Sequence, residues 1–326
     1  MTNANKALIA QLNNAWPRRA TVCDMEKFRV DGEFDAGRPD YPVALVPFFT
    51  HEGVQRLDDP VKQDILTWGW IGYNRRTVAA EDHVVNPALN YLASDILPGD
   101  DWIFTESIRQ TLIDEHYHTL MHLNAIQRTR RQRQIDTDMD LPMSVTYREL
   151  EKLKQQLVEP WEKQLAAVAF ATVAEISVNA FLDILADDQT IQPQNRSVAQ
   201  LHNRDEYAHS KTLGEIGKVV FNRLTPSQKT FFIATLPVAL RAFVAQDFSM
   251  WEAILRQLNV PNAANIIRDC QQPGKESALT RDYSGLHRLA DELGILGELD
   301  FDFGNGTTST GRATTAANTV ATQHAH

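Results

Sequence analysis

The stretch DEHYH, residues 114–118, has the pattern D-E-x-x-H, and DEYAH at residues 205–209 repeats it. Both copies lie inside segments whose apolar residues recur every three to four positions, as they do in helices. Residues three apart on a helix lie nearly one above the other, so the glutamate and histidine of each copy can reach one ion. Two such patterns arise by chance in about one sequence in a thousand at background composition, so the repetition indicates a shared role.

The residue types in this pattern indicate a dinuclear metal site. A carboxylate oxygen beside a neutral imidazole suits iron or manganese. Two Glu-x-x-His helices, with one glutamate from each of two further helices, form the ligand set of dinuclear carboxylate sites in four-helix bundles. The two copies therefore predict two more glutamates, each on a helix of its own.

Glu175 is the first candidate, because it lies inside the almost wholly apolar stretch AAVAFATVAEISVNAF, residues 166–181. Burying an ionised carboxylate costs several kcal/mol unless a partner compensates it. Three interpretations of Glu175 therefore compete: a residue within a membrane, one member of a buried ion pair, or a metal ligand. The polar residues Asn179 and Asp183 interrupt and follow the run, which argues against a membrane span. The two D-E-x-x-H copies favour a metal ligand.

Glu81, in TVAAEDHVVNPALNYL at residues 77–92, is the second candidate, and Glu106 is its rival. Glu106 lies nine residues before Glu115 on the same expected helix, which places it about 13 Å along the axis. A four-helix site needs a separate helix, so we prefer Glu81.

His202 extends the second copy to HNRDEYAH, residues 202–209, and falls on the same helical stripe as Glu206 and His209. A third imidazole can complete the coordination of one ion. The other seven histidines are interpreted as surface or core residues, and only His122, four residues after His118, is expected near the site. Asp114 and Asp205 point about 100° away from the ligand glutamates, so they are either solvated or accept a hydrogen bond from a ligating imidazole.

The rest of the chain predicts a mainly α protein. Helices are expected at residues 60–72, 78–95, 104–132, 147–187, 196–223, 226–246, 249–258 and 284–293, with Pro87 and Pro160 kinking or splitting two of them. We expect one all-α domain over residues 1–303, with an irregular N-terminal region to about residue 55. Residues 304–326 have almost no apolar bulk and are expected to be a disordered C-terminal tail.

Composition limits the possible partners and compartment. The 326 residues carry a formal net charge of −10, which argues against general binding to nucleic acid. The two cysteines match neither a disulfide framework nor a CxxC zinc motif. The N-terminus lacks the features of a secretion signal, so we expect a cytoplasmic protein that is not held in a membrane.

These residues resemble the non-haem diiron N-oxygenases typified by p-aminobenzoate N-oxygenase, together with related arylamine oxygenases. The resemblance extends from Glu81 to His209, leaves both termini unmatched, and is most specific in the stripe of His202, Glu206 and His209. It implies a ferritin-like four-helix bundle with additional helices and a carboxylate-bridged diiron core. It also implies seven metal ligands: Glu81, Glu115, His118, Glu175, His202, Glu206 and His209.

The chemistry that the resemblance implies is oxidation at nitrogen. Two iron ions, with O2 as co-substrate, would oxidise a primary amine to hydroxylamine, nitroso or nitro products in natural-product biosynthesis. An external reductase or ferredoxin would supply electrons, and a homodimer is expected. A different diiron oxidase, such as a carbon hydroxylase or desaturase, and a non-catalytic ferritin-like iron-binding protein stay open as alternatives.

The substrate is less constrained by the sequence. Arg76, just before Glu81, could hold a substrate carboxylate or lie on the surface. Tyr73, Phe181 and Asn179 are further candidates for substrate contacts, with helix packing as the competing interpretation. An aromatic amine and an aliphatic amino acid both stay open.

Overall fold

The computed structural model describes residues 3–27, 29–97, 102–271 and 283–303, which form helices and short 3-10 turns with no β-strand. The helices that carry the fold are α1 (Asn3–Arg19), α2 (Glu52–Gln55), α3 (Asp59–Ala80), α4 (Asn86–Tyr91), α5 (Trp102–Gln132), α6 (Val145–Gln156), α7 (Pro160–Ser177), α8 (Asn179–Asp187), α9 (Pro193–Arg223), α10 (Pro226–Val244), α11 (Phe248–Gln257), α12 (Ala263–Cys270) and α13 (Ser284–Glu292).

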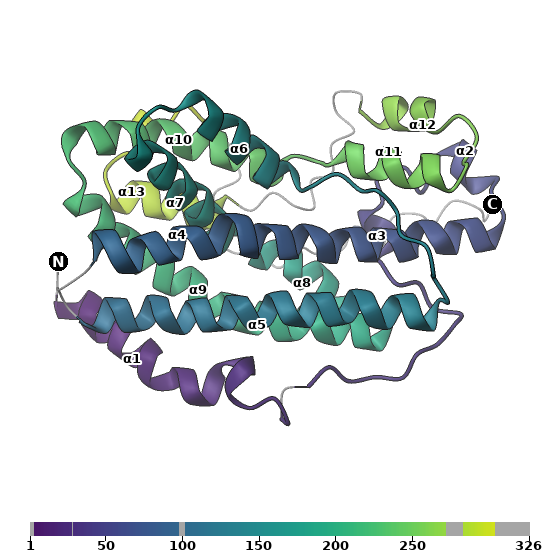
Figure 1. Cartoon of the computed structure of the whole chain (residues 1–326), viewed down its shortest axis with the longest axis horizontal. Helices are drawn as coiled ribbons and strands as arrows, with labels where there is room; N and C mark the ends of the chain where they lie inside the picture. The colour runs from purple at the N-terminus through teal and green to yellow at the C-terminus, as the bar shows by residue number, and fades with distance from the viewer. Residues whose placement is uncertain (1–2, 28, 98–101, 272–282, 304–326) are drawn as a thin grey trace, which may run out of the picture.

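Four long helices form the expected bundle. Helix α3 packs on α5, α5 packs on α9, α9 packs on α7, and α7 closes the ring against the continuation of α3 into α4. In Figure 1, α3–α4 and α5 run side by side along the long axis, and α9 continues behind α5. The ferritin-like helical fold is therefore confirmed.

One continuous rod replaces the two helices expected at residues 60–72 and 78–95. Gly69 and Gly72 lie inside α3, where an added Cβ would come within 2.8 Å of the Trp251 ring and 2.6 Å of the Met250 sulfur, respectively. The two glycines allow α11 to approach α3 closely. They thus serve helix packing and do not end the helix.

The rod absorbs Pro87 through a π-helical turn, η3 (Glu81–Val85), and a second such turn, η4 (Leu92–Ile96), follows α4. Proline lacks an N–H, and its ring clashes with the carbonyl four residues earlier in an α-helix. The Asn86 N–H bonds to the Glu81 carbonyl five residues back, so the wider turn accommodates the proline without splitting the helix. Such turns are frequent at functional sites, and this one begins at Glu81.

Two apolar clusters fill the two ends of the bundle. The first contains Val84, Leu112, Val173 and Leu213, and the second contains Tyr73, Met121, Leu182 and Val198. Along each bundle helix and the segment that continues it, the predicted metal ligands fall between a residue of the first cluster and a residue of the second. The polar layer therefore lies between two dry apolar layers.

The predicted helix 147–187 is divided into α6, α7 and α8. Pro160 starts α7, and a capping box of Glu159 and Glu162 closes its N-terminus, as expected from the missing N–H of a first-turn proline. The stretches Pro160–Asp187 and Pro226–Gln257 are both long and apolar enough to span a membrane, whereas the sequence suggested this only for the run around Glu175. Buried residues make up 67% and 50% of their windows, which is also the pattern of core helices in soluble proteins.

The N-terminal region differs from the expectation of an irregular segment to about residue 55. Residues 3–19 form α1, which packs on α5 and α9, and its mixed polar sequence shows little helical periodicity. Beyond α1, the described part of the region up to α2 holds only the short 3-10 turns Thr21–Cys23 and Val43–Leu45. The predicted tail, residues 304–326, lies outside the described residues.

Candidate metal centre

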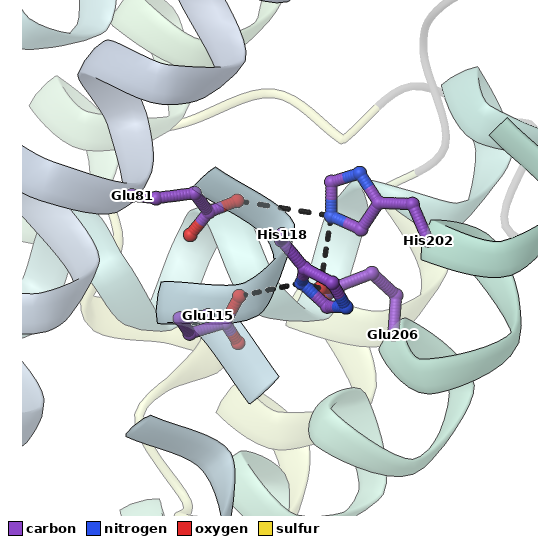
Figure 2. A group of neighbouring side chains, drawn as sticks. All are labelled: Glu81, Glu115, His118, His202 and Glu206. Atoms are coloured by element: carbon purple, nitrogen blue, oxygen red, sulfur yellow. Dashed lines mark hydrogen bonds and ion pairs between the residues drawn. The ribbon is translucent and has the colours of Figure 1, made fainter. Parts of the chain in front are cut away.

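Four glutamates and three histidines, which are all seven predicted ligands, converge in the polar layer of the bundle. They fall into two groups whose potential ligand atoms lie within 4.8 Å of one another: Glu81, Glu115, His118, His202 and Glu206 in the first, and Glu115, Glu175, Glu206 and His209 in the second. Figure 2 shows the side chains of the first group pointing toward a common centre. The rival candidate Glu106 belongs to neither group and accepts a hydrogen bond from Asn13 at 3.2 Å.

Glu115 and Glu206 belong to both groups. His118 Nδ1 lies 2.9 Å from Glu115 Oε2 and 3.4 Å from Glu206 Oε1. His209 Nδ1 lies 2.7 Å from Glu115 Oε1 and 3.2 Å from Glu206 Oε1. Two carboxylates shared between two imidazole-containing groups are the arrangement that bridges a pair of ions.

Each of the two aspartates pairs with a histidine on the opposite helix. Asp114 on α5 lies 3.0 Å from Nε2 of His209 on α9, and Asp205 on α9 lies 3.3 Å from Nε2 of His118 on α5. Each Nε2–H donates to an aspartate of the opposite helix, so each Nδ1 faces the carboxylates. Such a partner fixes the tautomer of a ligating histidine.

Helix α1 and the 3-10 turn that follows it support these aspartates, which periodicity could not indicate because the partners lie far apart in the sequence. Trp16 Nε1 donates to both Asp114 oxygens at 3.0 and 3.1 Å. The Thr21 N–H donates to both Asp205 oxygens at 3.3 and 3.2 Å. The Arg19 guanidinium lies 3.7 Å from Asp114 and 3.5 Å from Asp205, and so offsets their negative charge.

His202 faces the site through its other ring nitrogen. Its Nε2 lies 3.1 Å from Glu206 Oε1 and 3.7 Å from Glu81 Oε1. Its Nδ1 lies 2.8 Å from Nε2 of His122, and Nδ1 of His122 lies 2.7 Å from the Asn74 side-chain oxygen. The expectation that His122 lies near the site is confirmed, whereas Asn74 was not predicted.

The neighbouring imidazoles divide the four buried glutamates into two pairs with opposite pKa shifts. Burial and then the neighbouring carboxylates raise the pKa of Glu81 and of Glu175 well above the usual value. Burial also opposes the ionisation of Glu115 and Glu206, but the adjacent imidazoles outweigh it and lower the pKa of both. Among the four glutamates, the surroundings therefore favour the charged form most at the two shared ones.

The histidines divide in a matching way. Burial disfavours the charged form of His118 and His209, but Glu115 and the other acceptors outweigh it and raise the pKa of both well above 6.5. Burial, and then neighbouring histidines, lower the pKa of His122 and His202. The raised pKa values of His118 and His209 favour their charged forms beside Glu115 and Glu206, and metal binding would displace those protons.

The donor set fits two cations. Within the described part of the chain, one oxygen of each of Glu81, Glu175 and Glu206 is buried and has no hydrogen-bond donor. An unpaired buried carboxylate oxygen is costly, and a metal ion relieves that cost. The four carboxylates, if all ionised, would match the charge of two divalent ions, and their oxygens together with imidazole nitrogens suit iron or manganese.

A cavity of about 600 Å³ borders the cluster. Its wall includes Glu81, Glu175, His202 and Glu206 of the cluster, and also three of the predicted substrate residues, Tyr73, Arg76 and Phe181. The buried Arg76 Nε has no acceptor within the described residues. Asn179 is not on this wall, because its amide donates at 2.9 Å to the side chain of Asn203 on α9.

Comparison with known proteins identifies the group to which this centre belongs. The family model described as p-aminobenzoate N-oxygenase AurF matches residues 2–294. The chain belongs to this family. It is also 36% identical over 302 residues to the 4-aminobenzoate N-oxygenase of Streptomyces thioluteus, covering 91% of this chain and 89% of that protein.

Membership of the AurF family makes the chain an oxygenase enzyme and disfavours iron storage, carbon hydroxylation and desaturation. The match is also wider than the resemblance from Glu81 to His209, because it includes α1 and most of the C-terminal helices. Trp16 and Arg19, which contact the aspartates behind the cluster, thus lie within the family match.

Proposed function

We propose that the chain is a diiron N-oxygenase in which Glu81, Glu115, His118, Glu175, His202, Glu206 and His209 hold two iron ions. The observation that carries the proposal is the overlap of the two groups at Glu115 and Glu206, beside a cavity that contains Arg76. When bound, the two irons supply the activation of O2. The chain contributes the position of the ions, a cavity beside them and a cation to orient the substrate.

The substrate that we propose is a small aromatic amine carrying a carboxylate, of which p-aminobenzoate is the first to test. Five residues separate Arg76 from Glu81 along one helix, a rise of about 7.5 Å and comparable to the length of a para-substituted benzene ring. The guanidinium can bind the carboxylate while the amine faces the wall formed by the cluster. The rings of Tyr73 and Phe181, whose centroids are 5.6 Å apart, provide an aromatic wall for the substrate.

The first oxidation has a defined electron balance. Conversion of RNH2 and O2 to RNHOH and water consumes two protons and two electrons beyond those that the amine provides. We therefore propose an external donor, either a reductase or a ferredoxin. Later steps toward nitroso and nitro products can draw electrons from the partly oxidised substrate itself.

The decisive experiment loads the chain anaerobically with ferrous ion, counts the bound iron, and adds O2 with p-aminobenzoate, aniline or an aliphatic amino acid. We expect about two irons per chain. With p-aminobenzoate we also expect products whose mass shows added oxygen and whose nitrogen carries it. Chains that bind no iron, or that oxidise none of the amines, would refute the proposal.

Arg76→Ala tests the position of the substrate, and Arg75→Ala is its matched control because Arg75 binds Asp138 and the Met139 carbonyl. We expect the Arg76 variant to raise KM for p-aminobenzoate by about tenfold, the effect of ~1.4 kcal/mol of lost binding. The KM for aniline, which has no carboxylate, should not change. Equal effects of the two arginine variants would assign Arg76 to structure alone.

Two further proposals concern the setting of the enzyme. We propose a homodimer, the commonest closed assembly, which light scattering on the purified chain would test. We also propose a cytoplasmic enzyme, and fractionation of the producing cells would test that compartment.

A further inference from the structure

The three site histidines are not supported in the same way. The outward nitrogens of His118 and His209 meet aspartates, which are anionic acceptors. The outward nitrogen of His202 meets His122, a second imidazole that is fully buried and that pairs, within the described part of the chain, with His202 and Asn74 and with no carboxylate. His122 is not one of the seven proposed ligands, so its burial beside His202 requires a separate explanation.

The orientation of Asn74 determines the protons along this chain of contacts. Its side-chain nitrogen donates to the Trp70 carbonyl at 2.7 Å, so its oxygen must be the atom that faces His122. That oxygen can only accept, and His122 Nδ1 therefore carries a hydrogen. In a neutral imidazole the other nitrogen is then an acceptor, so Nε2 of His122 accepts from His202.

The same logic continues to the cluster. If His202 donates from Nδ1, a neutral His202 keeps a lone pair on Nε2, the nitrogen that lies 3.1 Å from Glu206. Metal coordination needs that lone pair, and the opposite tautomer would present a hydrogen to the ion. Asn74 thus selects, through His122, the form of His202 that can bind metal.

We propose that His122 and Asn74 are positioning residues that hold His202 in its metal-binding tautomer and thereby strengthen one of the two metal positions. The inference rests on the proposed diiron site. His122 would act on the ion beside Glu81, His118 and His202, because the second group contains no atom of His202. A general structural role would instead affect both ions.

Cobalt(II) provides a test that needs no turnover. The full-length chain is titrated anaerobically with Co(II), and the two binding steps are followed by calorimetry and by the visible absorption of the ion. His122→Phe keeps a ring of similar shape without nitrogen, whereas His122→Gln retains an oxygen that can accept from His202. Asn74→Leu and Asn74→Asp form the corresponding pair one step further out, since only the aspartate retains an acceptor.

We expect His122→Phe to weaken one Co(II) step by about 10- to 100-fold and leave the other at the wild-type affinity, which is the usual cost of losing such a support. His122→Gln should restore most of the loss. Asn74→Leu should resemble His122→Phe, and Asn74→Asp should lie closer to the wild type. Melting of the metal-free variants shows which of them fold, and the Asn74 pair decides the question if His122→Phe does not.

Two unchanged binding steps in His122→Phe, or equal weakening of both, would overturn the inference. The same holds if the glutamine and aspartate variants are as weak as their apolar counterparts. A wild-type chain that binds no Co(II) or iron would instead remove the proposed diiron site, so the two failures are distinguishable.

Discussion

The two D-E-x-x-H copies on α5 and α9 agree at the centre and differ at both flanks. Four residues before the glutamate, α5 has Thr111 whereas α9 has His202. Four residues after the histidine, α5 has His122 whereas α9 has Leu213. Both differences place an imidazole at one end of the site, where His122 and His202 meet, and leave Thr111 and Leu213 to occupy buried positions at the other end.

The difference also shows which end of the nearly symmetric site borders the cavity. His202 lies on the wall of the cavity, whereas Leu213 belongs to the first apolar cluster, with 2% of its surface exposed. The shared core of the motif can hold two ions in equivalent ways. The added imidazole pair makes the two groups of ligand atoms unlike on the side where Arg76 and Tyr73 line the cavity.

The largest expected effect comes from the residues in which the copies agree. Glu115→Gln and Glu206→Gln each remove a negative charge that both ions share, so we expect either variant to lose both ions and all turnover. Metal analysis after anaerobic loading checks this. Retention of one ion at wild-type affinity in either variant would contradict the shared role.

The next largest effect separates the two groups. Glu175→Gln and Glu81→Gln each remove a carboxylate found in only one group, so each variant should bind one ion normally and lose the other. Titration with Co(II) counts the remaining equivalents. If both variants lost both ions, the positions would be cooperative and the division into two groups would be wrong as a description of binding.

A pH series tests the charge balance common to both copies. The raised pKa values of Glu81 and Glu175 mean that the folded metal-free chain holds protons that the unfolded chain releases, so its stability falls as pH rises. The raised pKa values of His118 and His209 have the same sign, because their stabilisation is complete below about 6.5 and is lost as pH rises through the folded value.

The measurement is best made between pH 6.5 and 8, where only the raised pKa values change the stability of the metal-free chain. The lowered pKa values of Glu115 and Glu206 affect stability only near and below pH 4.5, and those of His122 and His202 only below pH 6.5. Metal binding needs deprotonated ligands and strengthens over the same window. We expect the melting temperatures of Mn(II)-loaded and metal-free chains to diverge by at least about 2 °C, the effect of ~1 kcal/mol. If the difference between the two melting temperatures stayed constant or became smaller as pH rises, the cluster would not release protons when metal binds.

The agreement between the copies is also what the sequence could predict. A repeated pattern with helical spacing indicates which side chains share a face, so Glu115, His118, Glu206 and His209 could be chosen before any coordinates, and the same stripe added His202. Glu81 was preferred to Glu106 because the site needs a separate helix. The lone Glu175 in an apolar helix was equally informative, because a buried carboxylate is costly unless a cation or a metal ion compensates its charge. The four-helix bundle followed from the same residues.

The supports of the cluster could not be predicted, because they join segments with no common period. Trp16 meets Asp114 across 98 positions, and Asn74 meets His122 across 48. Asn179 was expected at the cavity because it lies one turn beyond Glu175, but its side chain donates to Asn203 on α9 and is not on the cavity wall. Helical spacing identifies the face of a residue approximately and leaves its tertiary partner undetermined.

The smallest predicted effect on metal affinity concerns the two aspartates, whose assignment to the ions is the reverse of what the sequence order suggests. Asp114 adjoins Glu115 in the α5 copy but supports His209 of the α9 copy, while Asp205 supports His118. Asp114→Asn should therefore weaken the ion held with Glu175 and His209, and Asp205→Asn the ion held with Glu81 and His118, each by about tenfold.

Double variants identify which ion each aspartate serves. Asp114→Asn combined with Glu175→Gln should leave the remaining ion at the affinity of Glu175→Gln alone, because both changes act on the same position. Asp114→Asn combined with Glu81→Gln should weaken the only ion left, since that ion depends on His209. Calorimetric titration with Co(II) measures both cases. The opposite assignment would mean that each aspartate acts through its own helix, and the crossed hydrogen bonds would then have no effect on metal binding.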